Sequence, residues 1–175
     1  LRNFLTTFID AAERPMSTTQ HIYLSPHYDD AVLSCGGQIA QRAAAGETVI
    51  VATVFGGAPN LEHLSPFAAA IHARPGGGDD LMAIRQDEDI HALDVLGAVS
   101  RPGDYLDCIY RQDGQRTRWF YDNEEALFGP VAPAERGLAH ELAQVFASLA
   151  PAPDQCVLYA PLAVGNHVDH QIVNK

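Results

Sequence analysis

The chain has 175 residues and a formal net charge of −11, because 22 acidic residues stand against 11 basic ones. Hydrophobic residues make up 47% of the sequence and charged residues 19%, a globular composition that excludes a disordered chain. The acidic balance argues against a protein that tracks nucleic-acid phosphates and against a polybasic membrane patch.

The first 20 residues are expected to stand apart from the rest. Apolar residues recur there at helical spacing, which predicts an N-terminal helix or extension over residues 1–20. Residues 21–175 are expected to form one domain. Because the sequence stops soon after a motif, with no helix or strand to close the domain, we expect this domain to be incomplete at its C-terminal end.

Between residues 21 and 80 the pattern alternates between strand and helix. A β-type run at residues 21–24 is followed by a helical pattern over residues 30–45, with Gly46 as a natural stop. Residues 48–55 are β-branched and apolar, as expected for a central parallel strand. The long irregular stretch at residues 56–80 suits a lid.

The second half continues this alternation. Residues 81–97 predict a helix in which Glu88 lies on the apolar stripe with Arg85 as its partner; the stripe comprises Leu81, Ile84, Ala92, Val95 and Val99. A strand at residues 104–110, a helix at residues 138–149 and a buried strand at residues 156–159 follow. The alternation implies an α/β domain with a mostly parallel sheet, whose sites lie at the carboxyl ends of strands.

The cysteines and the apolar runs indicate the cellular setting. Cys35, Cys108 and Cys156 form no CxxC pair, and their odd number and apolar neighbours favour reduced, buried thiols in a cytoplasmic protein. The longest strongly apolar run, residues 49–55, is far shorter than a membrane span, and no secretory signal opens the chain. We therefore expect a cytoplasmic protein with no membrane span.

A polar motif directly follows the first predicted strand. Residues 25–30 read Ser-Pro-His-Tyr-Asp-Asp. On one interpretation Asp29 and Asp30 only cap a helix N-terminus. On the other, His27 and Asp30 converge on one metal ion from a turn, and Asp29 is left free as a base.

A second polar motif follows the last predicted strand. Residues 165–170 read Gly-Asn-His-Val-Asp-His, which alone is also compatible with a polar surface loop. Taken together, the two motifs supply two histidines and a carboxylate at the carboxyl ends of two parallel strands. This donor set suits an open catalytic zinc site.

These motifs resemble those of the PIG-L/LmbE-like metal-dependent N-deacetylases. The family's first signature matches residues 25–31 and its His-x-Asp-His signature matches residues 167–170, while residues 85–88 and the Gly-Gly of residues 36–37 match its helices. The chain departs from the pattern in having Tyr28 for the family's Pro and Ala31 for its Glu, as in an Asp-Asp-Ala branch. The resemblance implies a Rossmann-like three-layer sandwich.

The resemblance also implies roles for individual residues. His27, Asp30 and His170 would bind the metal, with zinc as the first choice and another divalent metal as the alternative. Asp29 would be the general base that takes a proton from the attacking water. His167 would stabilise the oxyanion of the tetrahedral intermediate.

Three further residues receive roles by the same resemblance. Asp169 would orient His167, and Asp107 would lie in the site. Arg85 would contact substrate hydroxyls, or would be structural if it pairs with Glu88.

The expected activity is therefore hydrolysis of an N-acyl group, with acetyl as the first choice, from an amino-sugar conjugate of the N-acetylglucosamine type. Two alternatives stay open: a metal-dependent hydrolase of a non-sugar amide or ester, and a non-catalytic module that binds a metal or a sugar on the same fold. The expected partner is a small-molecule amino sugar or glycoconjugate, and not a nucleic acid.

Overall fold

The computed structural model describes residues 19–149 and 153–175. The helix expected near the N-terminus lies outside these residues, apart from Thr19 and Gln20. Gln20 is the first residue of the first strand. Within the described ranges, none of the helices combines the length and the apolar composition that a membrane crossing requires.

Four parallel strands form one sheet in the order β3-β2-β1-β4. They are β1 (Gln20–Ser25), β2 (Thr48–Thr53), β3 (Val99–Pro102) and β4 (Cys156–Tyr159). In the sheet, Ile22 of β1 pairs with Ile50 of β2 on one side and with Leu158 of β4 on the other. The predicted α/β fold with a parallel sheet is confirmed.

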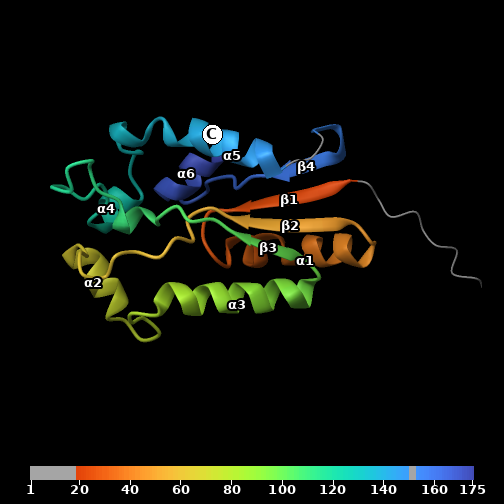
Figure 1. The fold of residues 1–175 in the computed structure, drawn as a ribbon, viewed down its shortest axis with the longest axis horizontal. Coiled ribbons are helices and arrows are strands. Elements are labelled where there is room, and N and C mark those ends of the chain that lie inside the picture. Colours follow the sequence, from red (N-terminus) through yellow and green to blue (C-terminus); the bar gives the residue numbers. More distant parts are fainter. Residues whose placement is uncertain (1–18, 150–152) are drawn as a thin grey trace, which may run out of the picture.

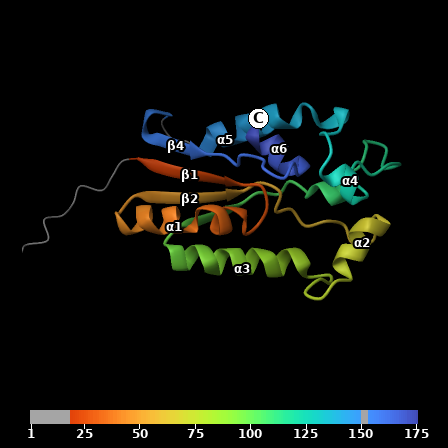
Figure 2. The same cartoon turned by 180° about the vertical axis from the view of Figure 1, so that it is seen from behind.

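Helices cover both faces of this sheet (Figure 1). The helices α1 (Asp30–Ala44) and α3 (Leu81–Leu96) lie on one face, and α5 (Leu138–Leu149) and α6 (Val168–Asn174) lie on the other. Figure 2 shows the same three layers from behind. The short helices α2 (Pro66–His72) and α4 (Glu124–Leu127) lie beyond the carboxyl ends of the strands.

Alternate residues of β1 build the two halves of the core. Ile22 and Leu24 pack with Leu142 of α5 and Ile172 of α6. Tyr23, between them, packs on the opposite face with residues of α1 and α3. This alternation is the period of a β-strand, and it places β1 at the centre of a three-layer sandwich.

The prediction of a strand at residues 104–110 is wrong. The third strand is β3 (Val99–Pro102), and a 3₁₀ turn, η1 (Cys108–Tyr110), occupies the end of the expected range. The Asp107 carboxylate accepts a hydrogen bond from the backbone N–H of Ile109 at 3.2 Å and so caps this turn. Such a local side-chain bond competes with strand pairing and ends the extended conformation.

The prediction of which face of α3 is buried is also wrong. Ile84 and Val95 are exposed, whereas Met82, Asp89 and Leu93 form the buried face. Apolar residues lie on both sides of this helix, so their spacing fits either face. The neighbouring elements decide the orientation, and they bring Asp89 rather than Glu88 inside.

Two expectations near the C-terminus need correction. The strand β4 is at the edge of the sheet, with Val157 39% and Leu158 51% exposed, and not buried as expected. The second motif runs directly into α6, where no helix was expected. Cys35, Cys108 and Cys156 are all free thiols, as expected, but only Cys108 of the three is buried.

Candidate active site

The turn after β1 holds His27 and Asp30 in a fixed relation. The buried Ser25 hydroxyl donates to the carbonyl of His27 at 2.6 Å and accepts from the N–H of Ala31 at 3.0 Å. The N–H of His27 donates to Oδ2 of Asp30 at 2.9 Å. These bonds close the turn at the start of α1. Asp29, the N-cap residue, makes no side-chain capping bond, and the hydroxyl of Ser25 accepts the first-turn N–H of Ala31 instead.

Asp29 presents an exposed carboxylate from a left-handed backbone conformation. Its φ is +77°, which only a few non-glycine residues tolerate. Its backbone N–H donates to Oδ1 of the buried Asp89 at 2.9 Å, and its own side chain is 58% exposed. Partial burial raises the pKa of Asp29, and the Arg85 guanidinium opposes that shift.

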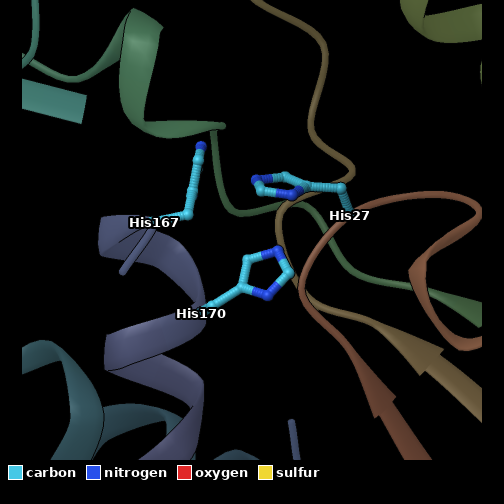
Figure 3. Close-up of side chains that lie close together, drawn as sticks. All are labelled: His27, His167 and His170. Atoms are coloured by element: carbon cyan, nitrogen blue, oxygen red, sulfur yellow. The ribbon is translucent and has the colours of Figure 1, made fainter. Parts of the chain in front are cut away.

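The three expected metal ligands lie close together, with the two histidines near one carboxylate oxygen of Asp30. Oδ2 of Asp30 lies 3.3 Å from Nδ1 of His27 and 3.2 Å from Nε2 of His170. Figure 3 shows His27 and His170 facing each other, with His167 beside them at the N-terminal end of α6. One nitrogen from each of these three rings lies within 4.8 Å of the others. Two imidazoles and a carboxylate fit the donor set of a catalytic zinc site.

Carboxylates surround His27 on both sides of its ring. Nε2 of His27 lies 2.9 Å from Oδ2 of Asp169 and 3.6 Å from Oδ2 of Asp107. Burial opposes the charged form, but the carboxylates of Asp169, Asp30 and Asp107 prevail and raise the pKa of His27 to about 10. Such a surplus of negative charge stabilises a cation, which also fits a divalent metal.

The expected contact between the Asp169 carboxylate and His167 is replaced by others. The carboxylate of Asp169 contacts His27, the guanidinium of Arg111 at 2.6 Å and the N–H of Cys108 at 3.0 Å. Only the backbone N–H of Asp169 faces Nδ1 of His167, at 3.3 Å. This amide makes Nδ1 the acceptor and assigns the proton of a neutral His167 to Nε2.

The electrostatics of His167 agree with a neutral ring. Burial lowers the pKa of His167, and the neighbouring His27 lowers it further. A neutral His167 therefore carries its N–H on Nε2, the atom that lies 4.0 Å from the thiol sulfur of Cys108.

Arg85 and Asp107 both reach the site. A nitrogen of Arg85 donates to the carbonyl of Tyr28 at 3.1 Å and lies 3.7 Å from the Asp29 carboxylate. Glu88, its expected partner, is exposed on α3. Arg85 is therefore directed toward the candidate base rather than along its own helix.

Sequence reasoning missed several polar residues around the site. Asp89 lies one helical turn after Arg85, a spacing that could have indicated it. Arg111 is bound by Glu135 through two nitrogens at 2.6 and 3.2 Å, and the Tyr121 hydroxyl donates to the same carboxylate at 2.6 Å. No motif marks these three residues, which meet only in the folded chain.

Two cavities lie near these groups. One of about 430 Å³ is bordered by Asp30 and His170 and by the loop at residues 160–164. The other, of about 830 Å³, is bordered by Arg111, by Trp119 and by residues 59–60 and 62–64 from the stretch expected to act as a lid. Both cavities are large enough for a small ligand.

Comparisons with known proteins agree with the two motifs. Residues 22–175 match the family model of PIG-L, described as GlcNAc-PI de-N-acetylase. The chain therefore belongs to the PIG-L family. It is 26% identical over 170 residues to 2′-N-acetylparomamine deacetylase of Niallia circulans and 30% identical over 174 residues to the enzyme of that name from Streptomyces fradiae. The matches cover 88% and 94% of this chain but only 59% and 56% of those relatives.

Solved structures give the same relationship. The chain is similar to a deacetylase–teicoplanin complex from the biosynthesis pathway of teicoplanin, with a TM-score of 0.74 and 33% identity over 89% of this chain and 63% of that one. It is also similar to the zinc-inhibited form of teicoplanin deacetylase, with a TM-score of 0.76 and 36% identity over 89% and 60% of the two chains.

Proposed function

We propose that this chain carries the site of a zinc-dependent N-deacetylase that removes an acetyl group from an amino-sugar conjugate of the N-acetylglucosamine type. The observation that carries the proposal is the meeting of His27, Asp30 and His170 around one carboxylate oxygen, next to the exposed Asp29. The named deacetylase relatives and the family membership support it.

The metal would be held by His27, Asp30 and His170. When bound, a divalent ion polarises the acyl carbonyl and lowers the pKa of a water molecule. The zinc-inhibited form of a related deacetylase supports zinc as a ligand, and the same donors suit other divalent ions.

Asp29 would act as the base and then as the acid. Its carboxylate takes a proton from water as the water oxygen bonds to the acyl carbon. The carbonyl C–N bond then breaks, and Asp29 returns the proton to the leaving nitrogen. The products are acetate and the free amine. The exposed position of Asp29 supports this role, because the carboxylate can approach a bound substrate.

His167 would stabilise the negative charge on the acyl oxygen. Its Nδ1 accepts the N–H of Asp169, so the proton on Nε2 is available for that oxygen. Arg85 and Asp107 would contact the sugar hydroxyls, a role that their places beside Asp29 and His27 support. Asp169 would act through His27, by orienting its ring.

A substrate panel tests this function. The zinc-loaded chain would be incubated with an N-acetylglucosaminide, with its O-acetyl counterpart and with a non-sugar acetamide, and the released acetate and free amine would be measured. We expect turnover of the N-acetylglucosaminide above the other two, and its loss in Asp29→Asn. Preferred cleavage of the ester or of the non-sugar amide would contradict the proposal. Zinc binding without any turnover would favour a binding module.

A further inference from the structure

An arginine that does not touch the candidate metal ligands is connected to them through Asp169. Arg111 directly follows the turn η1, and its side chain is only 11% exposed. One of its nitrogens lies 2.6 Å from Oδ1 of Asp169. The other oxygen of that carboxylate, Oδ2, lies 2.9 Å from Nε2 of His27. The Asp169 carboxylate therefore connects the guanidinium to the imidazole.

This connection fixes the plane of the Asp169 carboxylate. Oδ2 also accepts the N–H of Cys108 at 3.0 Å, and Oδ1, which has no hydrogen bond among the described residues, has the Arg111 guanidinium as its ion-pair partner. The opposite nitrogen of His27, Nδ1, faces Asp30. A rotation of Asp169 would break its bond to His27 or its contact with Arg111, so the arginine restrains the orientation of a ring that it does not contact.

Arg111 is itself held on several sides. Glu135 binds it through two nitrogens at 2.6 and 3.2 Å, and a third nitrogen donates to the carbonyl of Leu106 at 3.0 Å. Its guanidinium lies over the ring of Phe55, 4.8 Å from the centroid. Only the planar, forked guanidinium can satisfy two carboxylates and a carbonyl at once, so lysine cannot reproduce the arrangement.

From this geometry we infer that Arg111, held by Glu135, is a positioning residue for the metal site and acts through Asp169 on His27. The inference rests on the proposed function, because it takes His27 as a metal ligand. Groups that orient a ligating histidine typically change metal affinity or activity by about 10- to 100-fold when they are removed. A purely structural ion pair would change the stability of the chain and leave zinc affinity unaltered.

The test compares Arg111→Gln and Arg111→Lys with Arg136→Gln, which removes the exposed arginine next to Glu135 in the sequence. Folding is checked by circular dichroism. The zinc dissociation constant is then measured by competition with a chromophoric chelator, and the His27 Nε2–H signal is followed by NMR in the zinc-loaded chain. Turnover and KM for the N-acetylglucosaminide complete the set.

We expect zinc affinity to fall about 10-fold or more in Arg111→Gln and by a smaller factor in Arg111→Lys, with a shifted His27 signal, lower kcat and little change in KM. Arg136→Gln should match the parent. If Arg111→Gln does not fold, the zinc affinity of Arg111→Lys is the deciding measurement, because this variant keeps the positive charge beside Glu135 and Asp169. A folded Arg111→Lys with parental zinc affinity and an unshifted His27 signal overturns the inference, while a parent chain that binds no zinc overturns the proposed function as well.

Discussion

Asp29 combines an unfavourable backbone conformation with an exposed carboxylate. A left-handed conformation costs a non-glycine residue about 1–2 kcal/mol. The hydrogen bond from its N–H to the buried Asp89 offsets part of that cost. Backbone strain of this kind is typical of functional sites, where the surrounding structure maintains it.

Removing the Asp29 carboxylate should separate zinc binding from turnover. In Asp29→Asn we expect kcat to fall about 100- to 10,000-fold, because a positioned base contributes that much. Zinc content should stay at the parental level, since His27, Asp30 and His170 are unchanged. Steady-state kinetics and elemental analysis of the same preparation provide the two readouts. Parental turnover would show that another group acts as the base.

Asp89 is expected to support turnover by holding the backbone N–H of Asp29. Asp89→Leu removes the acceptor of the Asp29 N–H, so we expect the turn to relax and kcat to fall about 10- to 100-fold, as a displacement of about 1 Å would cause. Asp89→Asn keeps an oxygen at the same place and serves as the matched control. The comparison of kcat between the two folded variants is the measurement. Equal and parental kcat values would exclude a positioning role.

The residues of the site were predictable only where they lie within motifs. His27, Asp30 and His170 are separated by short spacings from the ends of strands, and the structure brings them together. The partner of Asp169 was not predictable, because His167 is its near neighbour in sequence and His27 its neighbour in space. Arg111 gives no sequence signal, since its partners come from distant segments.

At the scale of elements, the clear hydrophobic patterns of residues 30–45 and 48–55 predicted α1 and β2 correctly. The weaker patterns did not predict β3 or the orientation of α3. Four residues ending in proline gave too little signal for β3. The helix α3 was predicted correctly in extent but not in orientation, because both of its faces carry apolar residues. Elements with one distinct apolar face are readable from sequence, and elements whose orientation depends on their neighbours are not.

The segment after β2 depends on a close approach of two backbones. The N–H of Gly57 donates to the carbonyl of Tyr105 at 2.9 Å, and a Cβ on Gly57 would overlap the carbonyl of Asp104. We expect Gly57→Ala to destabilise the chain by about 1–3 kcal/mol. Gly37→Ala, in an open position of α1, should stabilise it by about 0.5–1 kcal/mol. Chemical denaturation measures both, and a neutral Gly57→Ala would contradict the contact.

The buried His21 of β1 should make stability depend on pH. Burial and the nearby Arg42 lower its pKa below the ordinary value of 6.5, whereas Glu47 opposes the shift. The folded chain thus prefers the neutral ring. Its contribution is complete above pH 6.5 and is lost as pH falls through the lowered pKa.

Two variants separate this contribution from that of other histidines. Thermal unfolding between pH 5 and pH 8, a range chosen around the ordinary histidine pKa, should show a smaller acid-side loss of stability in His21→Gln than in the parent. His91→Gln, at an exposed histidine whose pKa is raised, should not reduce that loss. An identical pH dependence in His21→Gln and the parent would argue against a neutral, buried ring.

At the scale of the whole molecule, the site assembles at the carboxyl ends of the parallel strands. His27 and Asp30 follow β1, Asp107 follows β3, and His170 lies on α6 after β4. The carboxyl ends of parallel strands all lie on the same side of the domain, so the topology brings these segments together. A metal held there would join the turn after β1 to α6, which are far apart in the sequence.

Metal content is the most direct test of this account. Elemental mass spectrometry would be applied to the purified chain and to His170→Ala, each reconstituted with zinc and then freed of unbound ion. We predict about one zinc per chain in the parent, as a single three-ligand site requires, and its loss in the variant. No stoichiometric zinc or other divalent metal in the parent, or full retention in a folded His170→Ala, would contradict the joint site of the two motifs.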